Sequence, residues 1–199
     1  LTITENSSNN GHVGYYADKV ANVSNVYLDD NFVFVVIDSV NTLFQYLGND
    51  SVIVLPDNCN GGNYVIDKYT FKDNTTIKSV KIPNSVTSIG ESAFYRCTSL
   101  TDIDIPNSVT SIGRSAFSGC SSLESITIPN GLSKIESYTF NECSSLTSII
   151  IPNSVTTIGE YSFFGCGKLN KLIIGNSVRY IETNAFEYCS GLTHLVIPQ

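Results

Sequence analysis

The sequence predicts a solenoid of stacked coils, with a parallel β-sheet on one face and an antiparallel β cap at the N-terminal end. Three observations predict this class of fold. A 23-residue pattern recurs over residues 82–196 without a shift of register. One short stretch of each copy alternates apolar and polar residues, as a half-buried strand does. Residues 1–54 do not repeat, and they read instead as short strands separated by turns.

Each copy of the repeat follows the pattern I-P-N-S-V-x-x-I-G-x-x-A-F-x-x-C-x-x-L-x-x-I-x. No single copy can bury its own apolar side chains, so we expect the copies to stack and to bury them between neighbours. The two most regular apolar columns are Phe71, Phe94, Phe117, Phe140, Phe163 and Phe186, and Leu100, Leu123, Leu146, Leu169 and Leu192.

The segment L-x-x-I-x-I-P, as in residues 100–106, predicts one strand per copy. Strands stacked about 4.8 Å apart form a parallel sheet, in which Ile103 and Ile105 face inward while Asp102 and Asp104 face outward. The V-x-x-I-G step predicts a brief second strand. The A-F-x-x-C segment is too short for a long helix and predicts a turn or 3₁₀ segment on the convex side.

The two ends of the array differ from its middle. Residues 55–81 form a degenerate copy, in which about four extra residues around positions 59–62 interrupt the pattern. We expect the solenoid to occupy residues 55–199, with five full copies over 82–196 and the start of another at 197. Strands expected over residues 20–28, 32–37, 43–47 and 51–55 predict an antiparallel meander within 1–54 that caps the solenoid.

Composition and charge exclude several classes of partner. The chain has 199 residues, 42% of them hydrophobic, and a formal net charge of -7. No run of Lys or Arg is present to neutralise a phosphate backbone, so the sequence predicts no nucleic-acid partner. No apolar stretch approaches the ~20 residues that span a bilayer. The chain contains no Met, so we expect a signal peptide and any anchor to lie outside it.

The sequence predicts no catalytic residue, no metal site and no cofactor. Five cysteines recur every 23 residues, at Cys97, Cys120, Cys143, Cys166 and Cys189. This spacing spreads thiols along a line, whereas metal ligands converge on a point, so we expect a row of small buried free thiols. The two histidines, at positions 12 and 194, have no partner at a spacing that favours catalysis, and no motif of a known catalytic site is present.

Function is expected in the outward strand positions, because these columns vary while the core columns recur. One column is Ser79, Asp102, Ser125, Ser148, Lys171 and His194, and the other is Lys81, Asp104, Thr127, Ile150, Ile173 and Val196. The candidate partner-binding face consists of Asp102, Asp104, Ser125, Thr127, Ser148, Ile150, Lys171, Ile173, His194 and Val196.

The second outward column becomes apolar toward the C-terminus, at Ile150, Ile173 and Val196. Exposed apolar residues in a row often mark a contact site. Two alternatives remain open: a segment outside this chain covers them, or they reflect only the preference of strands for branched residues.

Aromatic residues also occupy variable positions of the repeat, namely Tyr95, Tyr138, Tyr161, Phe164, Tyr180 and Tyr188. We expect them to line the opposite side or the edges of the solenoid. Packing against neighbouring coils is favoured over a role as partner anchors.

The segment IPNSVTSIGESAFYRCTSLTDIDIPNSVTSIG resembles the BspA-like class of leucine-rich repeats, and the resemblance covers residues 55–199. It implies a leucine-rich-repeat solenoid of the α/β horseshoe-type class, and a secreted or cell-surface protein that binds an extracellular protein of a host or a glycan. The resemblance implies no set of catalytic residues. The sequence departs from the pattern at Asn74 in place of Cys, Gly175 in place of Pro, and Glu136 and Glu182 in place of Gly.

Two functions therefore remain as hypotheses. The first is a surface adhesion module that binds its partner through the outward strand positions. The alternative is a structural spacer, a stalk that holds another domain away from the cell surface. An enzyme is disfavoured, because stacked strands offer an extended surface and no enclosed pocket.

Overall fold

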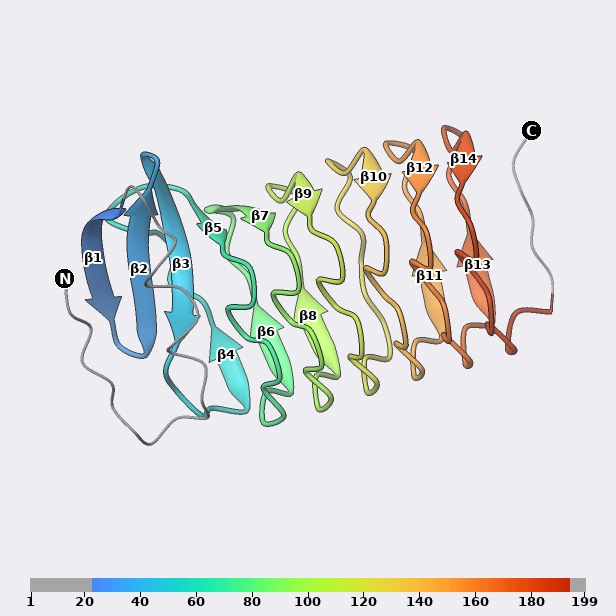
Figure 1. Cartoon of the computed structure of the whole chain (residues 1–199), viewed down its shortest axis with the longest axis horizontal. Helices are drawn as coiled ribbons and strands as arrows, with labels where there is room; N and C mark the ends of the chain where they lie inside the picture. The colour runs from blue at the N-terminus through green and yellow to red at the C-terminus, as the bar shows by residue number, and fades with distance from the viewer. Residues whose placement is uncertain (1–22, 194–199) are drawn as a thin grey trace.

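The computed structural model describes residues 23–193. It shows an elongated stack of coils (Figure 1). Residues 1–22 and 194–199 are outside the described part. Two candidate binding residues, His194 and Val196, lie outside it, as do the first residues of the strand expected over 20–28 and the start of a further repeat at 197.

Six coils form the solenoid, and each is named here by its Phe, from coil 1 with Phe71 to coil 6 with Phe186. Each coil has a strand-face segment, a second short strand and a turn that carries the Phe. The strand-face segments are β4 (Val52–Val54), β6 (Ser79–Lys81), β8 (Asp102–Asp104), β11 (Ser148–Ile150) and β13 (Lys171–Ile173). The second strands are β5 (Tyr64–Ile66), β7 (Val86–Ile89), β9 (Ser111–Ile112), β10 (Lys134–Ile135), β12 (Thr157–Ile158) and β14 (Tyr180–Ile181).

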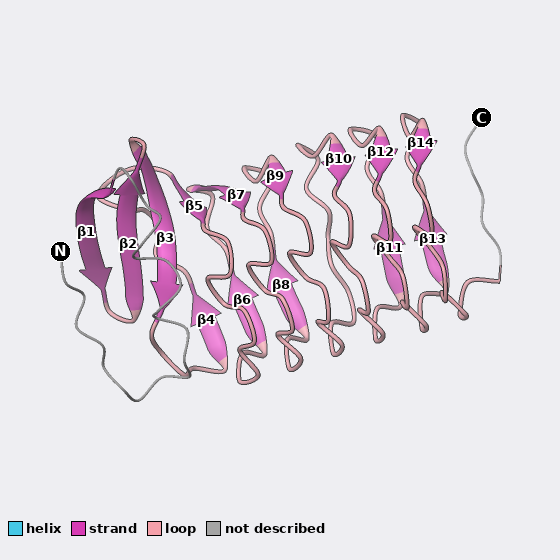
Figure 2. Ribbon diagram, viewed as in Figure 1, coloured by secondary structure: helices cyan, strands magenta, loops and turns pink. Residues whose placement is uncertain are grey.

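The predicted solenoid is confirmed, because these strands pair in parallel from coil to coil in the register that the repeat predicts. Ser79 and Lys81 of β6 pair with Asp102 and Asp104 of β8, one repeat later. The second strand at the V-x-x-I-G step is also confirmed. Residues 23–193 contain strands and turns but no helix (Figure 2), so this part of the chain has no helix that could cross a membrane.

The Phe turns consist of successive β-turns and not of 3₁₀ helix. In every coil, the residues two positions before and two positions after the Phe have positive φ, as Tyr138 and Glu142 do at 60° and 57°. Of these positions, only Gly119 and Gly165 are occupied by glycine. At the others, the Cβ of the side chain makes the left-handed conformation energetically unfavourable. Because φ changes sign every few residues, a regular helix cannot form there.

These turns form a third set of backbone hydrogen bonds between coils. The N–H of Phe94 donates to the carbonyl of Ala116 at 2.8 Å, and that of Arg96 donates to Ser118 at 2.8 Å. Each coil is therefore joined to the next through its Phe turn, and every pair of neighbouring coils except coils 3 and 4 is also joined through the strand face and the second strands.

The core runs unbroken along the axis of the solenoid. Phe94, Phe117, Phe140 and Phe163 are fully buried, and their rings stack nearly parallel from coil to coil. Centroid separations in the column lie between 4.8 Å and 5.6 Å. The inward direction of Ile103 and Ile105 is confirmed, since both are buried while Asp102 and Asp104 are exposed.

An antiparallel meander caps the N-terminal end, as the sequence predicts. It consists of β1 (Val23–Asp29), β2 (Phe32–Ile37) and β3 (Val40–Tyr46), with β2 in the middle. Because β3 pairs in parallel with β5, the meander extends the sheet of second strands into a mixed sheet of order β1-β2-β3-β5-β7-β9. The cap is thus continuous with the solenoid through hydrogen bonds as well as through side-chain packing.

One strand of the expected meander has a different place. The sequence analysis assigned residues 51–55 to the antiparallel cap, but β4 pairs in parallel with β6 and opens the strand face of the solenoid. An alternating V-I-V segment is compatible with both an antiparallel and a parallel sheet, so the pattern alone could not distinguish the two kinds of pairing. As a result, Val52 and Val54 lie on the outward columns of the strand face, where both are 63% exposed.

Both sheets are interrupted between coils 3 and 4, and we call this junction the seam. The strand-face sheet stops at β8 in coil 3 and resumes at β11 in coil 5. Coil 4 contributes only a bridge from its Ser125 to Ser148 of coil 5. Figure 1 shows no strand arrow on this face between β8 and β11. The sheet of second strands ends at β9, and a separate sheet begins at β10.

The Phe turns alone carry a regular set of backbone hydrogen bonds across the seam, from the N–H groups of Ser115, Phe117 and Gly119 to coil 4, at 2.7 to 3.1 Å. The stack of Phe117 on Phe140, which spans the seam, has the longest centroid separation in the column at 5.6 Å.

Candidate binding faces

The strand face carries the predicted binding residues in the order that the repeat predicts. Asp102, Asp104, Ser125, Thr127 and Lys171 are exposed. Ser148 is half-buried, while its strand neighbour Ile149 points into the core. The predicted binding residues therefore lie on coils 3 to 6, on one side of the described solenoid.

Two apolar side chains lie next to each other on this face. Ile150 and Ile173 are directly paired in the β11–β13 register, and 57% of Ile150 and 47% of Ile173 is exposed. Exposure on this scale contrasts with the adjacent Ile149 and Ile151, which are buried. Exposure of both members of a cross-strand pair leaves an apolar patch open to a partner.

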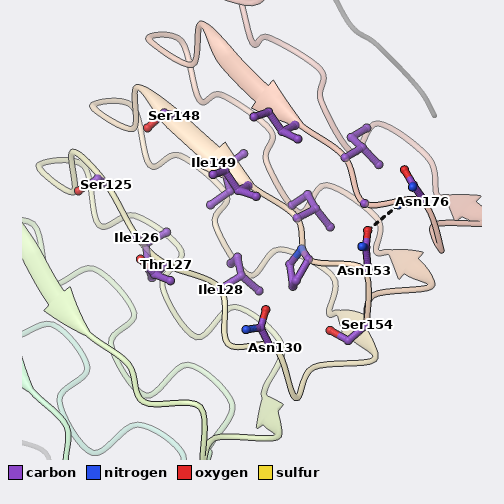
Figure 3. Close-up of a pocket in the computed structure, with 16 residues that line it drawn as sticks. Ser125, Ile126, Thr127, Ile128, Asn130, Ser148, Ile149, Asn153, Ser154 and Asn176 are labelled. Atoms are coloured by element: carbon purple, nitrogen blue, oxygen red, sulfur yellow. Dashed lines mark hydrogen bonds between the residues drawn. The ribbon is translucent and has the colours of Figure 1, made fainter.

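A shallow groove surrounds this apolar patch, with a volume of about 840 Å³. Figure 3 shows Ser125, Thr127, Asn130, Asn153 and Asn176 around it, from coils 4 to 6 and the turns that follow the strand face. All sixteen lining residues are uncharged. The groove thus combines an apolar floor with hydroxyl and amide groups at its rim, and it is open to solvent along one side.

Part of the amide rim also supports the scaffold. The side-chain oxygen of Asn107 accepts a hydrogen bond from the N–H of Asn130 at 3.0 Å, and Asn153 accepts one from Asn176 at 2.9 Å. The recurring Asn130, Asn153 and Asn176, which the sequence analysis did not include in the binding face, therefore lie at the groove as well.

A second groove lies on the other side of the seam and is charged. Its lining includes Val54, Asp57, Lys81 and Asp104, with a volume of about 590 Å³. Val54, which the sequence analysis left out of the binding face, lies at its apolar end, and Val52 is exposed on the same strand β4. The strand face therefore has apolar residues at both ends, separated by a charged and hydroxylic middle.

The recurring cysteines form the predicted row of buried thiols. All six cysteines of the chain are free and buried. Each thiol of the row donates to the Phe carbonyl of the preceding coil, as Cys120 does to Phe94 at 3.1 Å. Burial raises the pKa of Cys97 and Cys143 to about 12, so these groups are neutral thiols at physiological pH.

The residue in the thiol position of coil 1 is Asn74, and its side chain serves the same turn differently. The Asn74 Oδ1 accepts hydrogen bonds from the N–H groups of Thr76 and Ile77, at 3.0 and 3.1 Å. This departure from the repeat therefore preserves the turn. Within residues 23–193, no group of three or more His, Cys, Asp or Glu is placed to hold a metal ion.

Comparison with known proteins identifies the family. A model of the BspA type leucine rich repeat region matches residues 64–193 in six copies. The chain belongs to this family of leucine-rich repeat proteins. No curated protein matches the chain.

Several solved structures share the fold. A leucine rich cell surface protein from Faecalibacterium prausnitzii is 33% identical, with a TM-score of 0.75 over 82% of this chain and 46% of that one. A leucine-rich repeat protein from Bacteroides ovatus is 27% identical, with a TM-score of 0.56 over 88% of this chain and 52% of that one. The T. pallidum leucine rich repeat protein, at 24% identity, shares the fold with a TM-score of 0.63 over 84% and 91%. The chain spans less than half the length of the Faecalibacterium protein.

Proposed function

We propose that this chain is a protein-binding module displayed at a bacterial cell surface, and that it adheres to an extracellular protein of a host through its strand face. Leucine-rich repeat solenoids are in general scaffolds for binding proteins, and a described neighbour is a cell surface protein. The proposal includes secretion of the chain and a role in binding, without a chemical reaction.

The observation that carries this proposal is the exposed pair of Ile150 and Ile173 in its uncharged groove. Binding sites for proteins often place apolar side chains at the centre and polar groups at the rim. Covering the exposed half of each side chain under a partner would stabilise the complex by about 0.7 to 1.7 kcal/mol each, which is roughly half the value for a fully exposed isoleucine. Asp102, Asp104 and Lys171 would then set which partner is accepted, because charged groups at a rim govern specificity more than affinity.

The doubly substituted variant Ile150→Asp with Ile173→Asp tests this proposal. We expect it to lose binding to a panel of immobilised, purified extracellular-matrix and cell-surface proteins, measured by biolayer interferometry. Both positions are outward, so the thermal melting temperature should stay close to that of the unmodified chain.

The matched control is Val52→Asp with Val54→Asp, which places the same charges at the other end of the strand face, on the sheet beyond the seam. This control should retain binding. Equal loss in both variants, or binding that both variants retain, would contradict a site at Ile150 and Ile173. If the chain bound to a glycan array but to none of the proteins, its partner would be a glycan and not a protein.

A spacer remains the second candidate, supported by the elongated stack of coils and by the greater length of the Faecalibacterium relative. In that case the strand face would bind nothing, and Ile150→Asp with Ile173→Asp would leave every measured interaction of the full-length protein unchanged.

A further inference from the structure

The Phe turns form a second continuous surface, separate from the strand face. In coils 4 to 6, Tyr138 stacks on Tyr161 at 5.1 Å, and Tyr161 meets Phe164 edge-on at 5.5 Å. Phe164 in turn meets Tyr188 at 5.0 Å, and Tyr188 is 67% exposed. We call this surface the turn ridge. It consists of the side chains three and two positions before each Phe, and one and two positions after it.

In the first half of the ridge, basic side chains lie over the tyrosine rings. The Lys72 ammonium is 5.4 Å from the centroid of Tyr95, and the Arg96 guanidinium is 5.5 Å from the same ring. The Arg114 guanidinium lies 4.6 Å from the ring of Tyr138, a residue of the next coil. Aromatic rings of this surface therefore accept cations, as the negative faces of aromatic rings generally do.

The two halves of the ridge carry opposite charge. The charged side chains in coils 1 to 3 are Lys68, Lys72, Asp73, Glu91, Arg96 and Arg114. The charged side chains in coils 4 to 6 are Glu142, Glu160 and Glu187. The first half thus has four basic and two acidic groups, whereas the second half has three acidic groups and no basic group.

Small side chains occupy the ridge between these halves. Coil 3 places Ser115, Ser118 and Gly119 there. The side chain of Arg96 lies next to Gly119, because a Cβ on that glycine would be 3.0 Å from the Arg96 Cγ. The middle of the ridge is consequently low, with the longer charged and aromatic side chains on either side of it.

We propose that the turn ridge binds the turn ridge of a second copy of this chain in antiparallel orientation. A twofold contact uses the same surface on both copies, so it requires a surface that complements itself. Reversal of one ridge places the basic half of each copy against the acidic and aromatic half of the other. A parallel contact would place charges of the same sign together.

A twofold axis through coil 3 gives this contact a definite register. Coil 2 then opposes coil 4 of the other copy, and Arg96 faces Glu142, which occupies the same position of the turn. Coil 1 opposes coil 5, so that Lys72 faces Phe164. Each of these pairs occurs twice, because the axis repeats it. Coil 3, which carries Arg114, lies on the axis and opposes its own copy, and coil 6 lies beyond the contact.

The size of the ridge sets the strength of the contact. The five coils in the contact, at about 4.8 Å each, give a length on the order of 24 Å, and a width of about 10 Å gives on the order of 240 Å² per copy. Stable complexes bury about 800 Å² per partner. The dimer is therefore weak, and it weakens with salt because exposed charges dominate it.

Charge reversal tests the proposal on the whole chain. We expect sedimentation equilibrium in about 50 mM salt to show a monomer–dimer equilibrium, and Arg96→Glu or Glu142→Arg to raise its dissociation constant about tenfold or more. The double variant, with both charges reversed, should recover the dimer. Each substitution introduces a residue that the same left-handed position already holds in another coil, so both variants should fold.

The control is Lys81→Glu, which makes the same change of charge on the strand face. It should leave the equilibrium unchanged. A chain that is monomeric at about 1 mM in low salt would overturn the proposal, as would a dimer that both single variants retain. A dimer lost instead in Ile150→Asp with Ile173→Asp would place the contact on the strand face and would also overturn it. Because the ridge and the strand face are different surfaces, failure here leaves the proposed function untouched.

Discussion

At the scale of single residues, the Phe column has the largest share in stability. Phe140 is fully buried and contacts a Phe ring on each side, at 5.6 Å and 5.3 Å. Neighbouring coils cannot collapse into the space that this ring leaves, because three sets of hydrogen bonds hold coils 4 and 5 in register.

Phe140→Ala should therefore lower the free energy of unfolding by roughly 3 to 5 kcal/mol. Urea denaturation followed by circular dichroism measures this change. Phe186→Ala is the comparison, since the ring of Phe186 is only partly buried and should lose less. Similar losses in the two variants would show that the column is not stabilised by burial on both sides.

The buried thiols predict a dependence of stability on alkaline pH. Unfolded cysteines titrate near pH 9, whereas burial raises the pKa of Cys97 and Cys143 to about 12 in the folded chain. A raised folded pKa means that stability is fully present below pH 9 and is lost as pH rises toward 12. Each such thiol removes about 1.4 kcal/mol per pH unit within this window.

Thermal melts between pH 8 and 10.5 should therefore show a steep fall of the melting temperature above pH 9. Cys143→Ser removes one of these groups and should flatten the slope, although it lowers stability at neutral pH. A melting temperature that stays constant to pH 10.5 would contradict the role given to these thiols.

At the scale of elements, the strands of coils 2 to 6 follow from the sequence because one register fixes them all, except that the strand expected on the strand face of coil 4 is reduced to a single bridge. A side chain that faces inward in one copy must face inward in the next, which placed Ile103 inward and Ile150 outward correctly. The same argument fails where the repeat is absent. The pairing of β4 depended on the path of the chain beyond the repeat, and its alternating pattern carried no information on strand direction.

The extra residues of coil 1 also gain a role only in the structure. They form a tight hairpin closed by a bridge between Cys59 and Gly62. The Asn41 side chain of β3 donates to the carbonyls of Cys59 and Asn63, at 3.3 and 3.1 Å. The insertion that looked like repeat divergence therefore attaches the cap to the first coil.

Asn41→Asp should weaken this attachment, because a carboxylate keeps the shape of the amide but cannot donate. We expect a loss of about 1 kcal/mol for the two hydrogen bonds, and faster amide hydrogen exchange in residues 57–63. Asn107→Asp is the control, since the Asn107 side chain accepts its hydrogen bond from Asn130 and a carboxylate does the same. Unchanged exchange in 57–63 would count against the attachment.

At the scale of the whole molecule, the seam divides the hydrogen bonding into two blocks. Coil 4 keeps the apolar pattern of the repeat, with Ile126 and Ile128 buried, so nothing in the periodicity predicted an interruption there. Binary patterning specifies which side chains enter the core, but it does not specify how closely two coils approach each other.

Amide exchange should reveal the seam directly. The N–H groups of Thr156 and Gly159 donate to the preceding coil at 2.9 and 2.8 Å, whereas no such bond is made at the matching positions Ser133 and Glu136 of the described chain. We expect the amides of Ser133 and Glu136 to exchange about tenfold faster or more, measured by NMR. Equal protection at the four positions would show that the sheets are continuous in solution.

The seam has a mechanical consequence when the chain is pulled at its two ends. Pulling on the two ends loads the coil junctions in series, so every junction bears the same force, and the one with the fewest hydrogen bonds yields first. The break would fall between coils 3 and 4, where Ser115, Phe117 and Gly119 provide the regular backbone bonds. The cap with three coils would then separate from three further coils while each block stays folded. Extra length would thus be released under load before either block unfolds.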